Sequence, residues 1–259
     1  PQIVYYISAY CDLLAQGAVT EGEPVNFCVP TGNFGNILSA FYAKEMGLPI
    51  GRLLCASNSN NVLTDFIATG KYDRNRPFYN TVSPSMDILI SSNLERLLYL
   101  LSGGDDKLVA GYMKELSDTG CYQVSEEMRK KIQSVFVGGF SSEAETEATI
   151  GKMMDEHKYL IDTHTAVAFH VLEQYRKETG DQTKTVVAST ASPFKFCDAV
   201  LDALNVTDKA TGTALLDQLA EVSGMPAPQP LATLKDKQVR FTSWTEKEQM
   251  RAVVTDFLK

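Results

Sequence analysis

Residues 25–36 read Val-Asn-Phe-Cys-Val-Pro-Thr-Gly-Asn-Phe-Gly-Asn, and this stretch carries most of the information about the fold. Its first half is a short apolar run typical of a buried strand, and Pro30 ends that run. A loop of small residues follows, and residues 35–46 then have the pattern of a helix that stops at Gly47 and Pro49. Glycines in such a loop let the backbone approach a ligand, and the helix dipole favours an anion. The stretch therefore indicates either a phosphate-binding loop or an ordinary strand-to-helix turn.

The loop matches neither of the two common nucleotide-binding motifs. Only Gly32 and Gly35 are present, so it is not the G-x-G-x-x-G fingerprint of dinucleotide-binding proteins. No Gly-Lys-Ser/Thr triplet follows, which excludes a Walker loop. The residues of the loop alone leave the choice between an anion site and a turn open.

The neighbouring segments extend this unit into an α/β pattern. Residues 52–56 form a second apolar run, and residues 185–188 form a third one. Further helices are predicted at 2–15, 61–69, 92–101, 105–118, 125–135, 142–157, 163–178, 194–203, 211–222 and 245–258, with a loop at 71–87 and a short strand at 238–242. Strands separated by helices predict a helix-flanked, mostly parallel open sheet.

Polar residues follow each of the three apolar runs. In an open parallel sheet, ligands bind outside the carboxyl ends of the strands, here residues 30–36, 57–61 and 189–193. The second exit is rich in asparagine, which is often a turn or cap residue. The third carries Ser189 and Thr190, whose hydroxyls can cap a helix or meet a ligand.

Seven segments carry a resemblance to a known family. They are Tyr5-Tyr6, Pro-Thr-Gly-Asn-Phe-Gly-Asn at 30–36, Ala-Ser-Asn-Ser-Asn-Asn-Val-Leu at 56–63, Ser-Pro-Ser-Met-Asp-Ile at 83–88, Ser-Asn-Leu-Glu-Arg at 92–96, Asp-Thr-His-Thr-Ala-Val at 162–167 and Ser-Thr-Ala-Ser-Pro-Phe-Lys-Phe at 189–196. In this order they resemble threonine synthases, pyridoxal 5'-phosphate (PLP) enzymes of the tryptophan synthase β-like fold type. The resemblance runs from the first residue to about position 204.

This resemblance implies a domain organisation and a cofactor site. Residues 1–204 would be the large PLP-binding α/β domain, incomplete at its N-terminal side, and residues 205–259 a mainly helical extension packed on it. The cofactor phosphate would be bound by the loop residues Gly32, Asn33, Phe34, Gly35 and Asn36. The hydroxyl of Thr190, preferred to that of Ser189, would meet the pyridine nitrogen and tune the electron sink.

The resemblance also implies a reaction and a missing residue. The parent enzyme would convert O-phosphohomoserine and water to threonine and phosphate with PLP. In this family the lysine that holds PLP as a Schiff base lies in an N-terminal segment, and nothing here resembles that segment. Lys195 follows the ring-nitrogen motif and is not that lysine. We therefore expect a C-terminal fragment that has no catalytic residue of its own and is inactive alone.

Two alternatives stay open beside this interpretation. One is a phospho-lyase-like PLP relative that acts on another phosphorylated amino compound. The other is a non-catalytic module that binds phosphate or PLP. The presence of the Schiff-base lysine in the parent protein would favour an enzyme, and its absence would favour the module.

Composition narrows the choice of partners. The chain has 259 residues, a formal net charge of −8 and a pI near 5.0. Nucleic acid and anionic membrane surfaces call for basic patches, so we expect neither as a partner. No apolar run has transmembrane length. The predicted partner is a small phosphorylated amino acid, and the sequence does not give an oligomeric state.

The cysteines and histidines point to no metal site or disulfide framework. Five cysteines occur at irregular spacing without a Cys-x-x-Cys pair, which favours free thiols and a reducing, cytoplasmic location. His157, His164 and His170 show no metal-ligand spacing. His164 either contacts substrate or is a solvated residue at a helix start capped by Asp162 or Thr163. Around residue 145, a glutamate cluster fits a capping box better than a carboxylate site.

Overall fold

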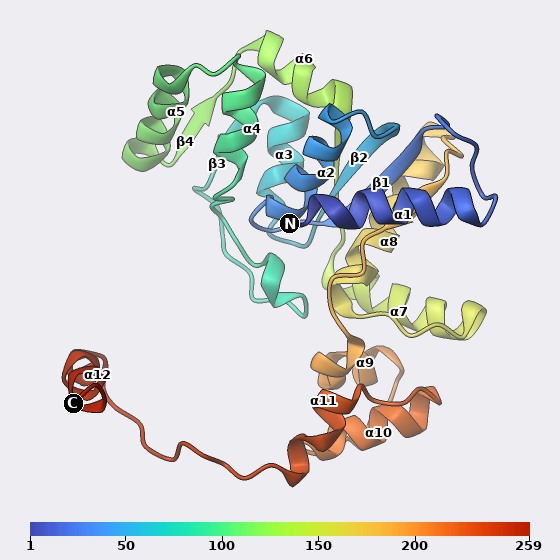
Figure 1. The fold of residues 1–259 in the computed structure, drawn as a ribbon, viewed down its shortest axis with the longest axis vertical. Helices are drawn as coiled ribbons and strands as arrows, with labels where there is room; N and C mark the ends of the chain where they lie inside the picture. Colours follow the sequence, from blue (N-terminus) through green and yellow to red (C-terminus); the bar gives the residue numbers. More distant parts are fainter.

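The computed structural model describes residues 1–259 and is built on a four-stranded sheet (Figure 1). The strands are β1 (Val25–Pro30), β2 (Ile50–Ser57), β5 (Phe136–Phe140) and β6 (Thr185–Val187). Their order is β5-β2-β1-β6, and every neighbouring pair is parallel. The predicted α/β fold with a helix-flanked parallel sheet is confirmed.

Helices cover both faces of this sheet. The helices concerned are α1 (Ile3–Ala15), α2 (Gly35–Glu45) and α8 (Thr163–Thr179). Phe27 and Leu53 point to the face covered by α1 and α2, where the largest apolar cluster lies. Their neighbours Cys28 and Leu54 point the other way, into a cluster with α8. Alternate residues therefore serve opposite faces, as the pleat of a strand requires.

A second lobe extends the core beyond β2. It contains α3 (Val62–Thr69), α4 (Leu94–Leu101), α5 (Asp106–Thr119), α6 (Glu126–Val135) and the antiparallel pair β3 (Lys71–Asp73) and β4 (Cys121–Gln123). Tyr72 and Tyr122 sit opposite each other in that pair and stack with ring centroids 5.3 Å apart. Their buried rings join the lobe to the main core.

The C-terminal part adds a smaller helical cluster. It is formed by α7 (Glu143–His157), α9 (Cys197–Ala203), α10 (Ala214–Ser223) and α11 (Gln229–Ala232), with 3-10 turns at Pro193–Lys195 and Thr233–Asp236. Two further 3-10 turns, Pro84–Met86 and Lys247–Gln249, lie outside this cluster. Ile150, Val200 and Leu219 are buried together there, so the cluster includes residues on both sides of position 204. The domain boundary at 204 stays a prediction.

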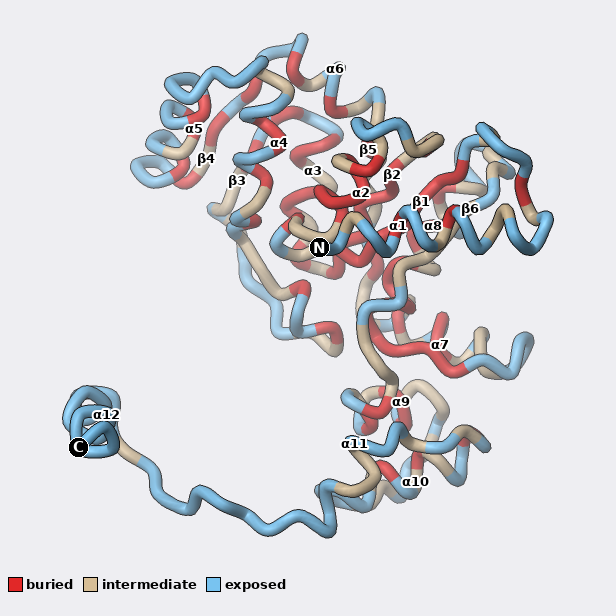
Figure 2. The backbone as a smooth tube through the Cα atoms, viewed as in Figure 1, coloured by how far each residue is buried: buried red, intermediate tan, exposed pale blue.

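The last helix, α12 (Met250–Phe257), lies apart from this cluster (Figures 1 and 2). It has no buried residue, and the chain that leads to it is exposed. The packing predicted for residues 205–259 is therefore seen only in the first part of that range.

Several sequence expectations were wrong. Residues 238–242 form no strand, and the loop expected at 71–87 begins with β3. The sequence did not predict strand β5, because the two consecutive glycines in Phe-Val-Gly-Gly-Phe are typical of a turn. A Cβ atom at Gly138 would lie 2.9 Å from the Thr64 Cα atom, and one at Gly139 would lie 2.6 Å from the Val171 Cγ1 atom. The glycines are needed because helices approach β5 closely from both faces.

The structure also bears on two expectations, about membrane-spanning segments and about the cysteines. No helix combines the length and the apolar character that crossing a membrane would require. All five cysteine thiols are free, with Cys28 and Cys55 fully buried in strands.

Candidate cofactor site at the strand exits

The loop between β1 and α2 is anchored by Phe34. This residue has the left-handed φ of 65°, which is uncommon for a large side chain. Its ring is 1% exposed and packs on Phe136 with centroids 5.4 Å apart. Burial of the ring stabilises a strained backbone position, because the contact is available only in this conformation. The left-handed residue of this loop is thus Phe34 and neither of its two glycines.

The carbonyl groups of the loop are turned toward the segment before α4. The Gly32 carbonyl accepts a hydrogen bond from the Ser91 hydroxyl at 2.8 Å. The Asn33 carbonyl accepts two, from the Asn93 backbone N–H at 3.1 Å and from its side-chain amide at 2.7 Å. These bonds hold the loop against the segment before α4 through its carbonyl groups.

Six consecutive backbone N–H groups, from residue 32 to residue 37, have no acceptor within the chain. The first hydrogen bond of α2 runs from the Leu38 N–H to the Phe34 carbonyl. Free N–H groups at the start of an 11-residue helix, joined to those of the preceding loop, form an anion-binding arrangement. Any helix start leaves about four such groups free, so the additional donors here are the N–H groups of Gly32 and Asn33. The donor set fits a phosphate group, and that role stays a prediction.

The two glycines of the loop have different roles. A Cβ atom at Gly32 would lie 2.7 Å from the Ser85 carbonyl oxygen and 3.2 Å from the Met86 Cα atom. At Gly35 the nearest atom would be the Asn93 Nδ2 atom at 3.4 Å, an ordinary contact. The close backbone approach thus occurs at Gly32, and Gly35 is an unstrained first residue of α2.

A cavity of about 450 Å³ brings the first and third strand exits together. Asn36 from the start of α2 and the Ser189-Thr190 pair after β6 both line it. Tyr6 of α1 lines it too, and its hydroxyl donates to the Asn36 Oδ1 atom at 2.7 Å. Burial raises the pKa of Tyr6, so the phenol remains a donor.

The two hydroxyl groups after β6 differ in availability. Ser189 accepts a hydrogen bond of 3.4 Å from the Thr165 hydroxyl, whereas Thr190 makes none within the chain. Both residues are exposed at the cavity. The Thr190 hydroxyl is therefore free to bond another partner, and its preference over Ser189 at a ring nitrogen stays a prediction.

His164 is neither solvated nor free to reach a ligand. It is 3% exposed, its Nδ1 atom lies 3.0 Å from Asp162 Oδ1, and its Nε2 atom accepts the Ser85 N–H at 3.2 Å. Accepting that N–H requires an unprotonated Nε2 atom, so the proton is at Nδ1. Asp162 caps α8, as predicted. The solvated histidine expected there is wrong, and the ring instead holds the 83–86 turn against α8.

The asparagines at the second exit bind the chain itself. Asn58 is buried and donates to Asp87 Oδ1 at 2.7 Å, and Asn60 donates to the same atom at 3.1 Å. Thr81 also donates to Asp87. This network secures the loop before α4 at the end of β2. Asp87 and Asn93 were not singled out by the sequence, and only their place in matching segments could have indicated them.

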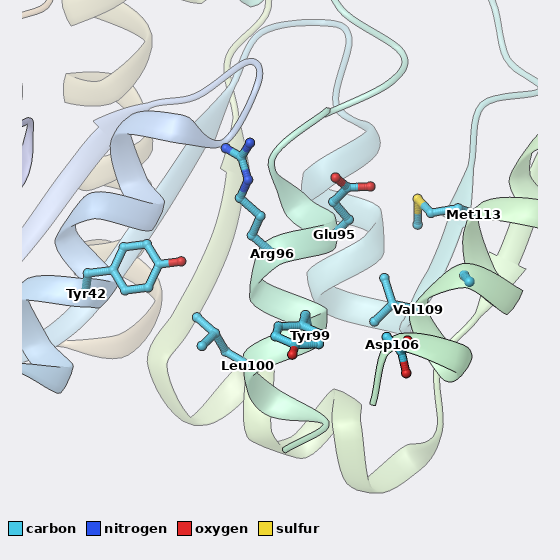
Figure 3. Close-up of a pocket in the computed structure, with 9 residues that line it drawn as sticks. Tyr42, Glu95, Arg96, Tyr99, Leu100, Asp106, Val109 and Met113 are labelled. Carbon is cyan, nitrogen blue, oxygen red and sulfur yellow. The ribbon is translucent and has the colours of Figure 1, made fainter. Parts of the chain in front are cut away.

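Other cavities contain none of the predicted site residues. Figure 3 shows one of about 500 Å³ between α2, α4 and α5, with Tyr42, Leu100 and Val109 on its wall. Arg96 lies at its edge, turned away from Leu100, and bonds to the Asn93 side chain. Lys195 lines a separate cavity of about 610 Å³ beside Leu216.

The capping box of Ser142 and Glu145 is formed as predicted.

Comparison with known proteins gives three consistent results. A family model described as threonine synthase, C-terminal, matches residues 165–254. Human threonine synthase-like 1 is 43% identical over 228 residues, which cover 87% of this chain and 30% of that protein. Among solved structures, PLP-bound threonine synthase from Brucella melitensis aligns with a TM-score of 0.82 and 35% identity, over 100% of this chain and 49% of the other.

The yeast enzyme gives a similar structural match. Yeast threonine synthase superposes with a TM-score of 0.84 and 32% identity over 99% of this chain and 51% of its own. The fold is thus that of the PLP-binding domain of fold type II enzymes. Within that class the chain belongs to the threonine synthase family. It spans about half the length of these solved relatives.

Proposed function

We propose that this chain supplies the phosphate-binding and ring-nitrogen parts of a threonine synthase active site. The enzyme would convert O-phosphohomoserine and water to threonine and phosphate with PLP. The observation that carries the proposal is the run of six unpaired N–H groups at residues 32–37, next to a cavity that Asn36 shares with Thr190. Family membership and the PLP named in the Brucella structure support it.

Each residue has a role that follows from its contacts. The N–H groups of the loop would hold the cofactor phosphate by charge-assisted hydrogen bonds. The Thr190 hydroxyl would bind the ring nitrogen without forcing its protonation, as a carboxylate would. Tyr6 fixes the Asn36 side chain and so shapes the cavity between these two points. Bound PLP would supply an electron sink for carbanions at the substrate.

We propose further that the lysine for the cofactor is supplied by polypeptide outside this chain. The lysine nearest in sequence to the ring-nitrogen motif, Lys195, lines a different cavity from Thr190. The enzyme would act in the cytoplasm on a small phosphorylated amino acid. The acidic chain, with a net charge of −8, agrees with such a small-molecule role.

A binding experiment tests the site. PLP is titrated with the chain and followed by the 31P resonance of its phosphate. Pyridoxal, which lacks the phosphate and has no 31P signal, is measured as a competitor that displaces PLP. We expect pyridoxal to bind at least about tenfold more weakly, because it cannot use the loop donors. Thr190→Val should weaken PLP binding, whereas Ser189→Ala should leave it nearly unchanged. Equal binding of PLP and pyridoxal would refute the phosphate site.

A phospho-lyase-like relative is the second candidate. It is favoured by the fact that a protein 43% identical to this chain is named threonine synthase-like 1. The products distinguish the two functions when O-phosphohomoserine and another phosphorylated amino compound are each given to the gene product that carries this chain together with a cofactor lysine. Threonine with equal phosphate from O-phosphohomoserine supports a synthase, and equal phosphate and ammonia from the other compound, without threonine, support the lyase.

A further inference from the structure

The end of the chain forms a C-terminal arm, residues 237–259, that leaves the body after the Thr233–Asp236 turn (Figure 1). No hydrogen bond or salt bridge joins residues 238–259 to the remainder of the chain. The contacts of the arm are local, such as the Gln249 N–H bonded to the Glu246 carbonyl. The arm is thus held in place by nothing within this chain.

The arm carries the most exposed large apolar side chains of the whole structure. They are Phe257, Trp244, Phe241 and Leu258, with exposed fractions from 77% to 85%. Isolated exposed apolar residues are normal, but several within one short segment are typical of a surface that binds another polypeptide.

Helix α12 gives this surface a defined geometry. Its apolar residues occur at helical spacing and form one stripe: Met250, Val253, Val254, Phe257 and Leu258. A helix of eight residues is marginal in water by itself and depends on packing of its apolar face. The stripe therefore requires a partner surface.

The solved relatives indicate which partner this is. The superpositions on the Brucella and yeast enzymes cover 100% and 99% of this chain, so they include the arm. Those chains are about twice as long. Because the matching family model is the C-terminal one, most of their additional polypeptide precedes the aligned part. The aligned range thus includes the arm, and the relatives have further polypeptide outside that range.

We propose that the C-terminal arm is the docking surface for the complementary half of threonine synthase, the polypeptide that precedes the aligned part in the relatives. The apolar stripe of α12 and the Trp244 side chain are the anchors of that interface. The inference concerns assembly and does not rest on the proposed reaction.

Reconstitution from separately produced parts tests the proposal. This chain, labelled with fluorotryptophan, is combined with an unlabelled, tagged segment of yeast threonine synthase that ends where the alignment begins. Trp244 is the only tryptophan of the chain, so it gives one 19F resonance. We expect a 1:1 complex in which that resonance shifts and loses its sensitivity to solvent.

Matched variants on α12 locate the interface. Phe257→Ser with Leu258→Ser should weaken the complex roughly 30-fold or more, the usual effect of removing interface anchors. Thr255→Ser with Asp256→Ser, on the other side of the same helix, should retain it. The proposal is overturned if no complex forms, if the chain instead pairs with a second copy that already shields Trp244, or if both variants bind alike.

Discussion

Replacing Gly32 with alanine should damage both folding and phosphate binding. The added Cβ atom would lie 2.7 Å from the Ser85 carbonyl oxygen, about 0.7 Å short of an ordinary 3.4 Å contact. The backbone at 85 cannot yield freely, because the Ser85 N–H is bonded to the buried His164 ring. Overpacking of this kind costs about 1–3 kcal/mol of unfolding free energy.

Because the backbone at Ser85 resists displacement, part of the clash would instead shift the loop that contains Gly32. Moving the donors by a few tenths of an ångström weakens hydrogen bonds to a charged group, each worth about 1.5–3 kcal/mol. We therefore expect PLP affinity to fall roughly 10- to 100-fold. Gly35→Ala is the matched control, since its Cβ atom meets only Asn93 Nδ2 at 3.4 Å, and alanine is a good helix former.

Two measurements decide the outcome. Urea unfolding followed by circular dichroism gives the free energies of the two variants and the unsubstituted chain. Titration of PLP followed by 31P resonance gives their affinities. The reasoning fails if Gly32→Ala retains both stability and affinity, or if Gly35→Ala is damaged to the same degree.

Three further predictions concern activity, thiols and pH. The chain alone should release no phosphate from O-phosphohomoserine with added PLP, and turnover above the free-cofactor background would contradict this. Burial raises the pKa of the Cys55 thiol to about 12, so Cys55 should react with Ellman's reagent only after unfolding, while exposed Cys11 reacts at once and the denatured chain titrates five thiols. Hydrogen bonds from Thr183 and Tyr175 hold the pKa of Asp181 well below its ordinary 3.8, so protonation favours the unfolded chain and stability is lost as pH falls below about 4. Asp181→Asn should flatten the decline of urea midpoints between about pH 5 and pH 2, and an unchanged slope would count against the assignment.

The sequence predicted those parts of the fold that depend on local pattern. The run from Val25 to Pro30, the loop and α2 are all decided by neighbouring residues, so their positions were predicted closely. The capping box at Ser142 and the Asp162 cap are local for the same reason. Asn36 and Thr190 line one cavity because both follow the carboxyl ends of parallel strands, where ligands bind in an open sheet. This rule needs only the order of the strands.

The features that were missed depend on residues distant in sequence. Strands β3 and β4 have three residues each and form only because Tyr72 and Tyr122 meet across about 50 intervening residues. The left-handed Phe34 is stabilised by Phe136, which a turn rule based on glycine cannot anticipate. For His164 the sequence left substrate contact and a solvated position open, and its burial follows from the 83–86 turn, whose Ser85 N–H bonds to its ring. Tertiary contacts override local preference in each case.

The loop offers a run of backbone N–H donors, and this affects the protonation state of any phosphate that it binds. A dianionic phosphate accepts hydrogen bonds at all its free oxygens, whereas a monoanion carries a P–OH group that is itself a donor. A run of N–H donors would therefore favour the dianion. Since the second phosphate pKa is about 6, release of a phosphorylated cofactor becomes coupled to proton uptake. Mild acidification would release the cofactor while the fold stays intact.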